Sequence, residues 1–151
     1  MVFDHQMHMM NLITRVGWDY RIAASLQAEL GKPNEVIEKQ LREDVVEFVD
    51  YLLFLDEVPL NGKIQGTSRF TEEFASQGPK DSKGRSLRQL DLEHRLMRYP
   101  CSYMIYSPAF GGMPPTAKKA IYARMREVLD RFTATDRNAI LEILHDTKQD
   151  F

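Results

Sequence analysis

Apolar residues recur every three or four positions in the first third of the chain, which is the period of helices that bury one face. This pattern predicts one helix over about residues 3–28 and a second over about residues 35–55. Asn34 is suited to cap the second helix. Because only a short segment containing Gly31 and Pro33 separates the two, we predict an antiparallel helical hairpin.

Two sets of apolar residues should meet in this hairpin. The first set comprises Phe3, Met7, Met10, Ile13, Val16, Tyr20 and Ala23. The second set comprises Ile37, Leu41, Val45, Phe48, Leu52 and Leu55. His5 stands at the head of a further line formed by Met9, Leu12 and Val16. We therefore expect the ring of His5 to be at least half buried.

The chain changes character over residues 59–86, where glycine, proline and polar residues predict the longest irregular stretch. Phe70 and Phe74 lie four residues apart within it and indicate one or two helical turns. Because long loops in compact domains tend to be functional, this stretch is a candidate binding surface.

Ser86 and Gln89 have the spacing of a capping box. They predict a helix that continues to Pro100, where the proline should kink or end it. A second, shorter helical segment is expected to follow over residues 101–106.

The last part of the chain predicts two more helices. Apolar residues lie on one face of the segment 117–132, and Thr133 with Asp136 resembles a capping box for a final helix. No alternation of apolar and polar residues is long enough to predict a strand. The predicted fold class is all-α, an irregular bundle of about five helices with a long polar loop in the middle. We expect residues 1–151 to form a single helical domain, a fragment of a longer protein.

Composition and charge exclude several classes of protein. Hydrophobic residues make up 43% of the chain and charged residues 28%, as in folded globular domains. The formal charge of -2 is spread without long runs of one sign, so we do not expect nucleic acid as a partner. No apolar run approaches the roughly 20 residues of a membrane span. The single cysteine, Cys101, has no second thiol to pair with and should be buried as a small hydrophobe.

His5 and His8 are the residues with the clearest potential for ligand chemistry. They lie three positions apart in the first predicted helix and project from one side of it. Both imidazoles could reach a metal, or offer axial ligands to a haem. In the alternative interpretation, His8 belongs to a solvated polar stripe together with Asp4, Asn11, Arg15 and Asp19.

Glu43, Glu47 and Asp50 lie along one side of the second predicted helix. With His5 or His8 facing them, they would resemble a carboxylate and histidine site in a helical bundle. The chain lacks the Glu-x-x-His pairs that ferritin-like sites use. The sequence therefore favours a charged outer face.

Two further features could carry chemistry, a basic cluster before the predicted start at Ser86 and the remaining histidines. The cluster comprises Lys80, Lys83, Arg85 and Arg88. It would attract anions to the helix N-terminus, or it is a solvated basic loop. His94 shares a line with apolar residues and should be hydrogen-bonded in the core, whereas His145 should be exposed.

Four stretches of the chain together carry a resemblance to known sequences: residues 5–15, 84–87, 95–107 and 139–144. They resemble the C-terminal region of large, uncharacterised exported bacterial proteins, some of which look like c-type cytochromes with a haem-attachment motif upstream. The resemblance spans nearly the whole chain, and the run Arg-Leu-Met-Arg-Tyr-Pro-Cys-Ser-Tyr-Met-Ile-Tyr-Ser at 95–107 is its most specific part.

The resemblance implies an exported or periplasmic, cytochrome-like protein in which this chain is a helical accessory domain that helps to bury or ligate haem. His5, and second His8, would bind that cofactor. The partner would be the upstream region of a longer protein, or another protein. The chain has no CxxCH motif, so covalent haem attachment to it is excluded. Two alternatives remain open: a non-enzymatic interaction or packing module, and a metal-dependent enzyme that uses both histidines and the second-helix carboxylates.

Overall fold

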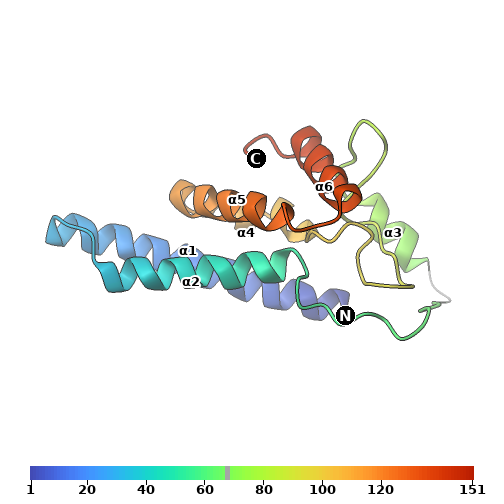
Figure 1. The fold of residues 1–151 in the computed structure, drawn as a ribbon, viewed down its shortest axis with the longest axis horizontal. Helices are drawn as coiled ribbons and strands as arrows, with labels where there is room; N and C mark the ends of the chain where they lie inside the picture. Colours follow the sequence, from blue (N-terminus) through green and yellow to red (C-terminus); the bar gives the residue numbers. More distant parts are fainter. Residues whose placement is uncertain (67–68) are drawn as a thin grey trace.

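The computed structural model describes residues 1–66 and 69–151, and Figure 1 shows their arrangement. Within these ranges the chain forms six α-helices, one 3₁₀ helix and no β-strand, which confirms the predicted all-α class. The elements are α1 (Val2–Leu30), α2 (Glu35–Leu52), α3 (Phe70–Ser76), the 3₁₀ helix η1 (Tyr103–Tyr106), α4 (Pro108–Gly111), α5 (Pro115–Leu129) and α6 (Ala134–Thr147). None of the helices in the described ranges combines the length and the apolarity needed to cross a membrane.

α1 and α2 form the predicted antiparallel hairpin (Figure 1). Gly31 ends α1 with φ +71°, and its N–H donates to the carbonyl of Gln27. Asn34 caps α2, because its side-chain oxygen accepts the N–H groups of Val36 and Ile37 at 3.0 and 3.3 Å. The signals at the hairpin turn are local, which is why the sequence alone could place them.

The buried face of α1 differs from the stripe that begins at Phe3. The buried residues of this helix are His5, Met9, Leu12, Ile13, Val16 and Gly17. Phe3 and Met7 are 71% and 49% exposed, so their predicted burial was wrong. Apolar side chains point to several sides of the first three turns, and packing against α2 and η1 selects the line headed by His5.

α2 buries half of its predicted face. The buried members of that face are Val45, Phe48 and Leu52. Leu55 is 40% exposed, because the helix ends at Leu52 and Phe54 then turns the chain with φ +55°. Ile37 and Leu41 are only partly buried, since they lie near the end of the hairpin that extends beyond α5 (Figure 1).

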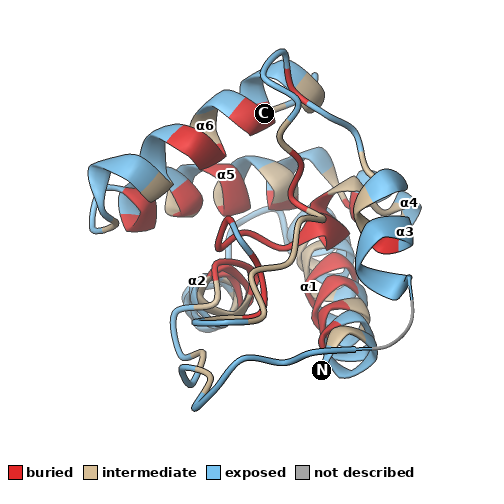
Figure 2. Ribbon diagram, turned by 90° about the vertical axis from the view of Figure 1, so that its right-hand side faces the viewer, coloured by how far each residue is buried: buried red, intermediate tan, exposed pale blue. Residues whose placement is uncertain are grey.

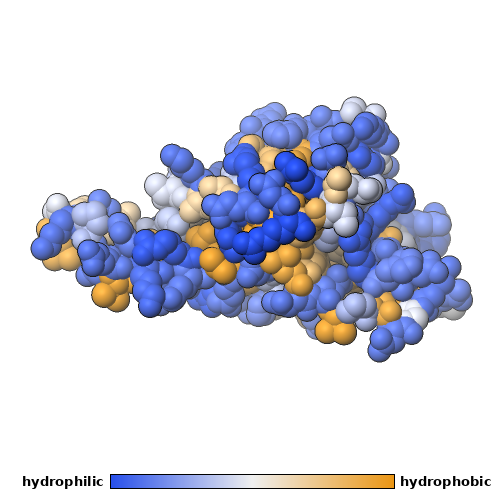
Figure 3. Space-filling view, viewed as in Figure 1, coloured by the Kyte–Doolittle hydropathy of each residue, from blue (hydrophilic) through white to orange (hydrophobic). Residues whose placement is uncertain are grey.

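α5 packs against the hairpin, and α6 lies on the side of α5 away from it (Figure 2). The predicted cap of α6 is confirmed, because the Thr133 hydroxyl accepts the N–H of Asp136 at 3.2 Å. Buried side chains of these two helices include Ile121, Met125, Val128, Ile140, Ile143 and Leu144. Most of the face seen in Figure 3 is hydrophilic, with apolar residues gathered near its centre.

The helix predicted to start at Ser86 does not form. One capping-box contact is present, since the Ser86 N–H donates to Oε1 of Gln89 at 3.4 Å. The chain then folds back on itself, and Leu90 and Met97 form an isolated antiparallel bridge. Leu92 turns the chain between them with φ +60°.

Asp91 explains why this segment turns. Its Oδ1 accepts the backbone N–H groups of Glu93 and His94 at 3.1 and 3.2 Å, a local arrangement that competes with helix formation. His94 lies at the tip of the turn with its side chain 79% exposed, so its predicted place in the core was wrong. His145 is exposed, as predicted.

The irregular stretch 59–86 contains α3 where Phe70 and Phe74 predicted a helical turn, while residues 67–68 lie outside the described part of the chain. Two cations of its basic cluster form ion pairs with carboxylates. Arg85 donates from Nε to Asp81 at 2.7 Å, and both Arg85 and Lys83 pair with Glu142 of α6. These contacts anchor the loop to α6, and two of the four cations are neutralised.

Candidate functional site

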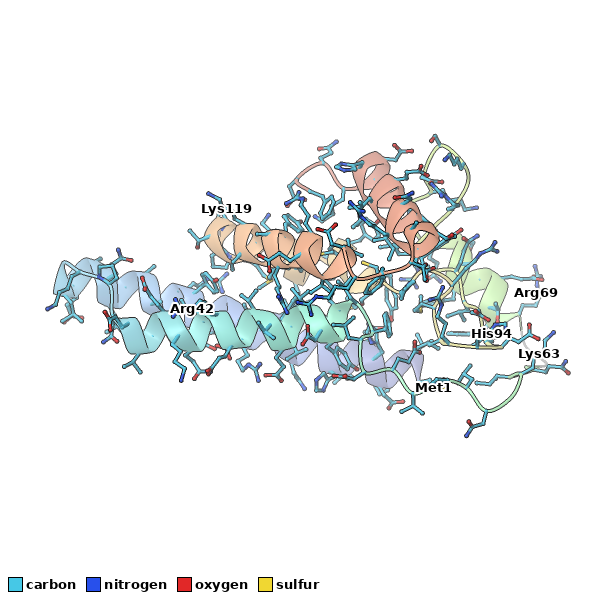
Figure 4. All side chains as sticks on the ribbon, viewed as in Figure 1. Met1, Arg42, Lys63, Arg69, His94 and Lys119 are labelled. Carbon is cyan, nitrogen blue, oxygen red and sulfur yellow. The ribbon has the colours of Figure 1, made fainter. Side chains whose placement is uncertain are left out.

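A cleft with a volume of about 780 Å³ lies along one side of the α1–α2 hairpin. Its walls come from the first turns of α1, the second half of α2 and the segment that follows α2. Met1 and Arg42, labelled in Figure 4, line opposite ends of it. The volume lies in the range of sites that hold small molecules or part of a partner protein.

His5 forms part of the apolar floor of this cleft. The residue is only 5% exposed, which confirms its predicted burial. Its ring stacks on the rings of Tyr51 and Phe54, with centroid distances of 5.1 and 4.5 Å and interplanar angles of 15° and 20°. The floor is therefore aromatic and pre-formed.

Phe54 reaches this position through an uncommon backbone conformation. Its φ of +55° lies in the left-handed region, which bulky residues rarely adopt. Such a conformation costs on the order of 1–3 kcal/mol and persists only where surrounding contacts hold it, often at functional sites. Here the N–H groups of Phe54 and Leu55 donate to the carbonyls of Tyr51 and Asp50 at 3.3 and 3.0 Å, and the ring of Phe54 stacks on His5.

His5 is also linked to the core by a buried hydrogen bond. Its Nε2 lies 2.7 Å from Oγ of Ser102, a residue with no exposed surface. Ser102 Oγ already accepts the N–H of Met104 at 3.2 Å, so its own proton is free for Nε2. The hydroxyl also has a second acceptor site, so it donates to Nε2 or accepts from it according to the tautomer of His5.

Burial, with a smaller contribution from the nearby His8, lowers the pKa of His5 to about 4. The imidazole is therefore neutral at pH 7. Since Ser102 is fully buried and bonded on both sides, the pair joins α1 to η1 and does not present an accessible nucleophile and base.

His8 lies at the edge of the same cleft, exposed to solvent, with its ring centroid 4.3 Å from that of Tyr51. The structure thus brings His5 and His8 together, with Glu43, Glu47 and Asp50 lining the same cleft. In the described ranges, however, no group of three or more His, Cys, Asp or Glu residues is placed to hold a metal ion.

Carboxylates dominate the rim of the cleft. The six acidic lining residues are Asp4, Glu43, Glu47, Asp50, Asp56 and Glu57, whereas Arg42 is the one lysine or arginine in the lining. Glu47 pairs with Arg15 at 2.6 Å, and Glu43 lies 3.6 Å from Lys39. The cleft therefore combines an apolar floor with an acidic rim.

Asp50 differs from the other rim residues. Solvent does not reach its Oδ1, and that atom has no hydrogen-bond partner among the described residues. An unpaired buried carboxylate oxygen is costly, and such groups in a folded protein call for an explanation. Asp50 as a residue lines the cleft, so a cationic group there would meet its negative charge.

The sequence identified the two histidines and the α2 carboxylates, but not Tyr51, Phe54 or Ser102. Ser102 lies 97 residues from His5 along the chain, so no local pattern could pair them. The available signal was that both residues fall in stretches that carry the family resemblance. Searches for similar proteins add nothing to this picture, because no family model, curated protein or solved structure matches the chain.

Proposed function

We propose that this chain is a non-enzymatic binding module whose cleft accepts an amphipathic helix bearing lysine or arginine residues. The observation that carries the proposal is an aromatic cleft whose rim holds six carboxylates, that of Asp50 among them. The helix would belong to another protein or to the upstream region of a longer chain.

The shape of the cleft supports a helical occupant. Arg42, Val46, Asp50 and Tyr51 line it from successive turns of one face of α2, and His8 lines it from the antiparallel α1. The groove between two antiparallel helices is the surface onto which a third helix packs in a bundle. From Arg42 to Tyr51 it runs about 14 Å at 1.5 Å per residue, room for two to three turns of a partner helix.

The charges of the cleft support a basic occupant. An apolar face of the partner would cover the rings of Tyr51 and Phe54, while flanking lysines or arginines would reach the acidic rim. One of them would approach the carboxylate of Asp50, which lines the cleft. Charge pairs that lose water on binding contribute more to affinity than pairs at an exposed rim.

The haem role implied by the family resemblance stays a prediction. The neutral imidazole of His5 beside an apolar cleft supports it, since a haem ligand must be unprotonated. Two features argue against it. Nε2 of His5 is bonded to Ser102, and the acidic rim would repel the negatively charged propionates of haem.

Haem titration separates the two occupants. If His5 ligates haem, added haem should give a shifted absorbance spectrum that His5→Gln loses and His145→Gln keeps. We expect no such ligand-specific shift, because the nitrogen of His5 that would bind iron is engaged with Ser102. A shift that depends on His5 would favour the haem role over the one proposed here.

The proposed function predicts selective binding of a basic amphipathic peptide. A fluorescein-labelled helical peptide of leucine and lysine, with leucines at every third or fourth position, should bind with a rise in anisotropy. The same peptide with glutamate in place of lysine should not bind. Affinity should fall as ionic strength rises, because part of the attraction comes from exposed charges.

Variants locate the binding on the cleft. Asp50→Asn removes the charge with little change in shape and should weaken binding about tenfold or more. Glu38→Gln is the matched control, since Glu38 lies on the same helix but outside the cleft. Equal losses in both variants, or equal binding of the lysine and glutamate peptides, would refute the proposal.

A further inference from the structure

A second cavity, with a volume of about 490 Å³, lies between α1, η1 and the segment that follows α3. It shares no lining residue with the acidic cleft. Its lining contains no aspartate or glutamate and one cation, Arg88. Two cavities of opposite charge character therefore occur in one small domain.

Arg88 is held in place by several contacts. Its guanidinium carbon lies 4.0 Å from the ring centroid of Phe74 and 4.6 Å from that of Tyr103. Its Nε donates to the carbonyl of Phe74 at 2.8 Å, and one terminal nitrogen donates to Oε1 of Gln77 at 3.0 Å. A guanidinium fixed in this way loses little freedom when it binds a ligand.

Gly78 is part of the same arrangement. A Cβ atom added at this position would lie 2.7 Å from Cδ of Arg88 and 2.6 Å from Oγ of Ser86, closer than Cβ contacts occur in proteins. Only glycine therefore allows the stem of Arg88 to pass this close to the backbone.

Arg88 has N–H groups that make no hydrogen bond within the described residues. A guanidinium carries five N–H groups, and the contacts to Phe74 and Gln77 use two of them. No acidic side chain in the described ranges pairs with it, whereas Arg85 and Arg95 are paired with Asp81 and Asp136. Burial lowers the pKa of Arg88, so the charge is partly desolvated without compensation from a carboxylate.

We infer that this cavity binds a small organic carboxylate through Arg88. The planar fork of an arginine matches a carboxylate in a two-bond geometry. Met10, Met104 and Pro108 supply apolar surface for the body of the ligand, and Gln6 adds a polar group. A singly charged carboxylate balances the one cation, whereas a phosphate dianion would leave an uncompensated charge in the cavity.

The test is a titration of the full chain with sodium benzoate, followed by ¹H–¹⁵N NMR on the Arg88 Nε–H and the Gly78 amide. Both resonances should shift in a saturable way at constant ionic strength, and sodium phosphate should shift them less. Arg88→Met should weaken binding at least tenfold. Arg98→Met is the matched control and should bind as the parent does, because Arg98 lies outside the cavity.

Two further variants guard against a change in fold. Arg88→Lys keeps the charge but loses the fork, and Gly78→Ala keeps Arg88 but displaces it; both should weaken benzoate binding while the rest of the spectrum stays in place. Linear, non-saturating shifts, stronger binding of phosphate, or undiminished binding in Arg88→Met would overturn the inference. Asp50→Asn should leave benzoate binding unchanged, so this result does not depend on the function proposed for the cleft.

Discussion

Lowering the pH from 7 to 4 should reduce the free energy of unfolding by about 3 kcal/mol through His5 alone. The pKa of His5 is about 4 in the folded chain, against an ordinary value of 6.5. Between these values the unfolded chain binds a proton that the folded chain does not, so stability falls as the pH falls. The difference of 2.5 pKa units corresponds to about 3 kcal/mol at 1.36 kcal/mol per unit.

No carboxylate of the described residues offsets the loss of water around the charged form of His5. Tyr51, Phe54 and Tyr103 present rings to it, Ser102 presents a hydroxyl, and His8 would add a like charge. Protonation would reverse the bond to Ser102, because Nε2 would then donate to the hydroxyl, so this contact does not offset the loss of water. The loss of stability should therefore appear in the range from pH 6.5 down to pH 4.

Urea unfolding at a series of pH values measures this effect. The parent chain should lose stability over that range, while His5→Gln should show a nearly flat profile there. His94→Gln should behave as the parent, because His94 is exposed at the tip of a turn. A steep profile that survives in His5→Gln would show that another group is responsible.

Two carboxyls with lowered pKa values, Asp150 and Asp81, act mainly in a lower pH range than His5. Ion pairs with Lys148 and Lys118 lower the pKa of Asp150 to about 2, against the opposing effect of burial, and Arg85 lowers that of Asp81. A lowered carboxyl pKa contributes stability above the ordinary value of 3.8, which is lost as the pH falls below it. These groups therefore add a further loss mainly below the range in which His5 titrates, and the comparison with His5→Gln removes their part from the result.

The sequence predicted the parts of the fold that depend on local signals. Asn34 and Thr133 cap helices through bonds to residues two or three positions away, and apolar periodicity located α1, α2, α5 and α6. The same kind of signal failed at Ser86. There a capping contact forms, but Asp91 closes a turn five residues later, and pairing of Leu90 with Met97 replaces the helix.

The candidate site was predictable in its residue types but not in its geometry. His5, His8 and the α2 carboxylates were all identified, because helical spacing puts them on definable faces. Whether they bind metal, face solvent or line a cleft depends on the end of α2, where Phe54 adopts a positive φ. The turn is closed locally, since the N–H of Leu55 donates to the carbonyl of Asp50 at 3.0 Å, but Phe54 is not a residue type that signals such a turn, and its stack on His5 joins two helices.

Leu52→Ala should lower the free energy of unfolding by about 2–5 kcal/mol, whereas Leu55→Ala should lower it by about 0.5 kcal/mol or less. The two residues have the same chemistry and lie three positions apart on the apolar line predicted for the second helix. Leu52 is fully buried, and its carbonyl accepts the N–H of Ser102 at 2.8 Å. Leu55 follows the end of α2 and is 40% exposed.

Truncation of Leu52 leaves a cavity where α2 meets the Ser102 segment, so the loss combines transfer and cavity terms. Truncation of Leu55 creates little cavity, because solvent already reaches this side chain. Urea midpoints of both variants, with the slope of the transition unchanged from the parent, give the two values. Equal losses would mean that α2 continues through Leu55 against the core, and the positive φ of Phe54, with the aromatic floor it builds under the cleft, would then have to be abandoned.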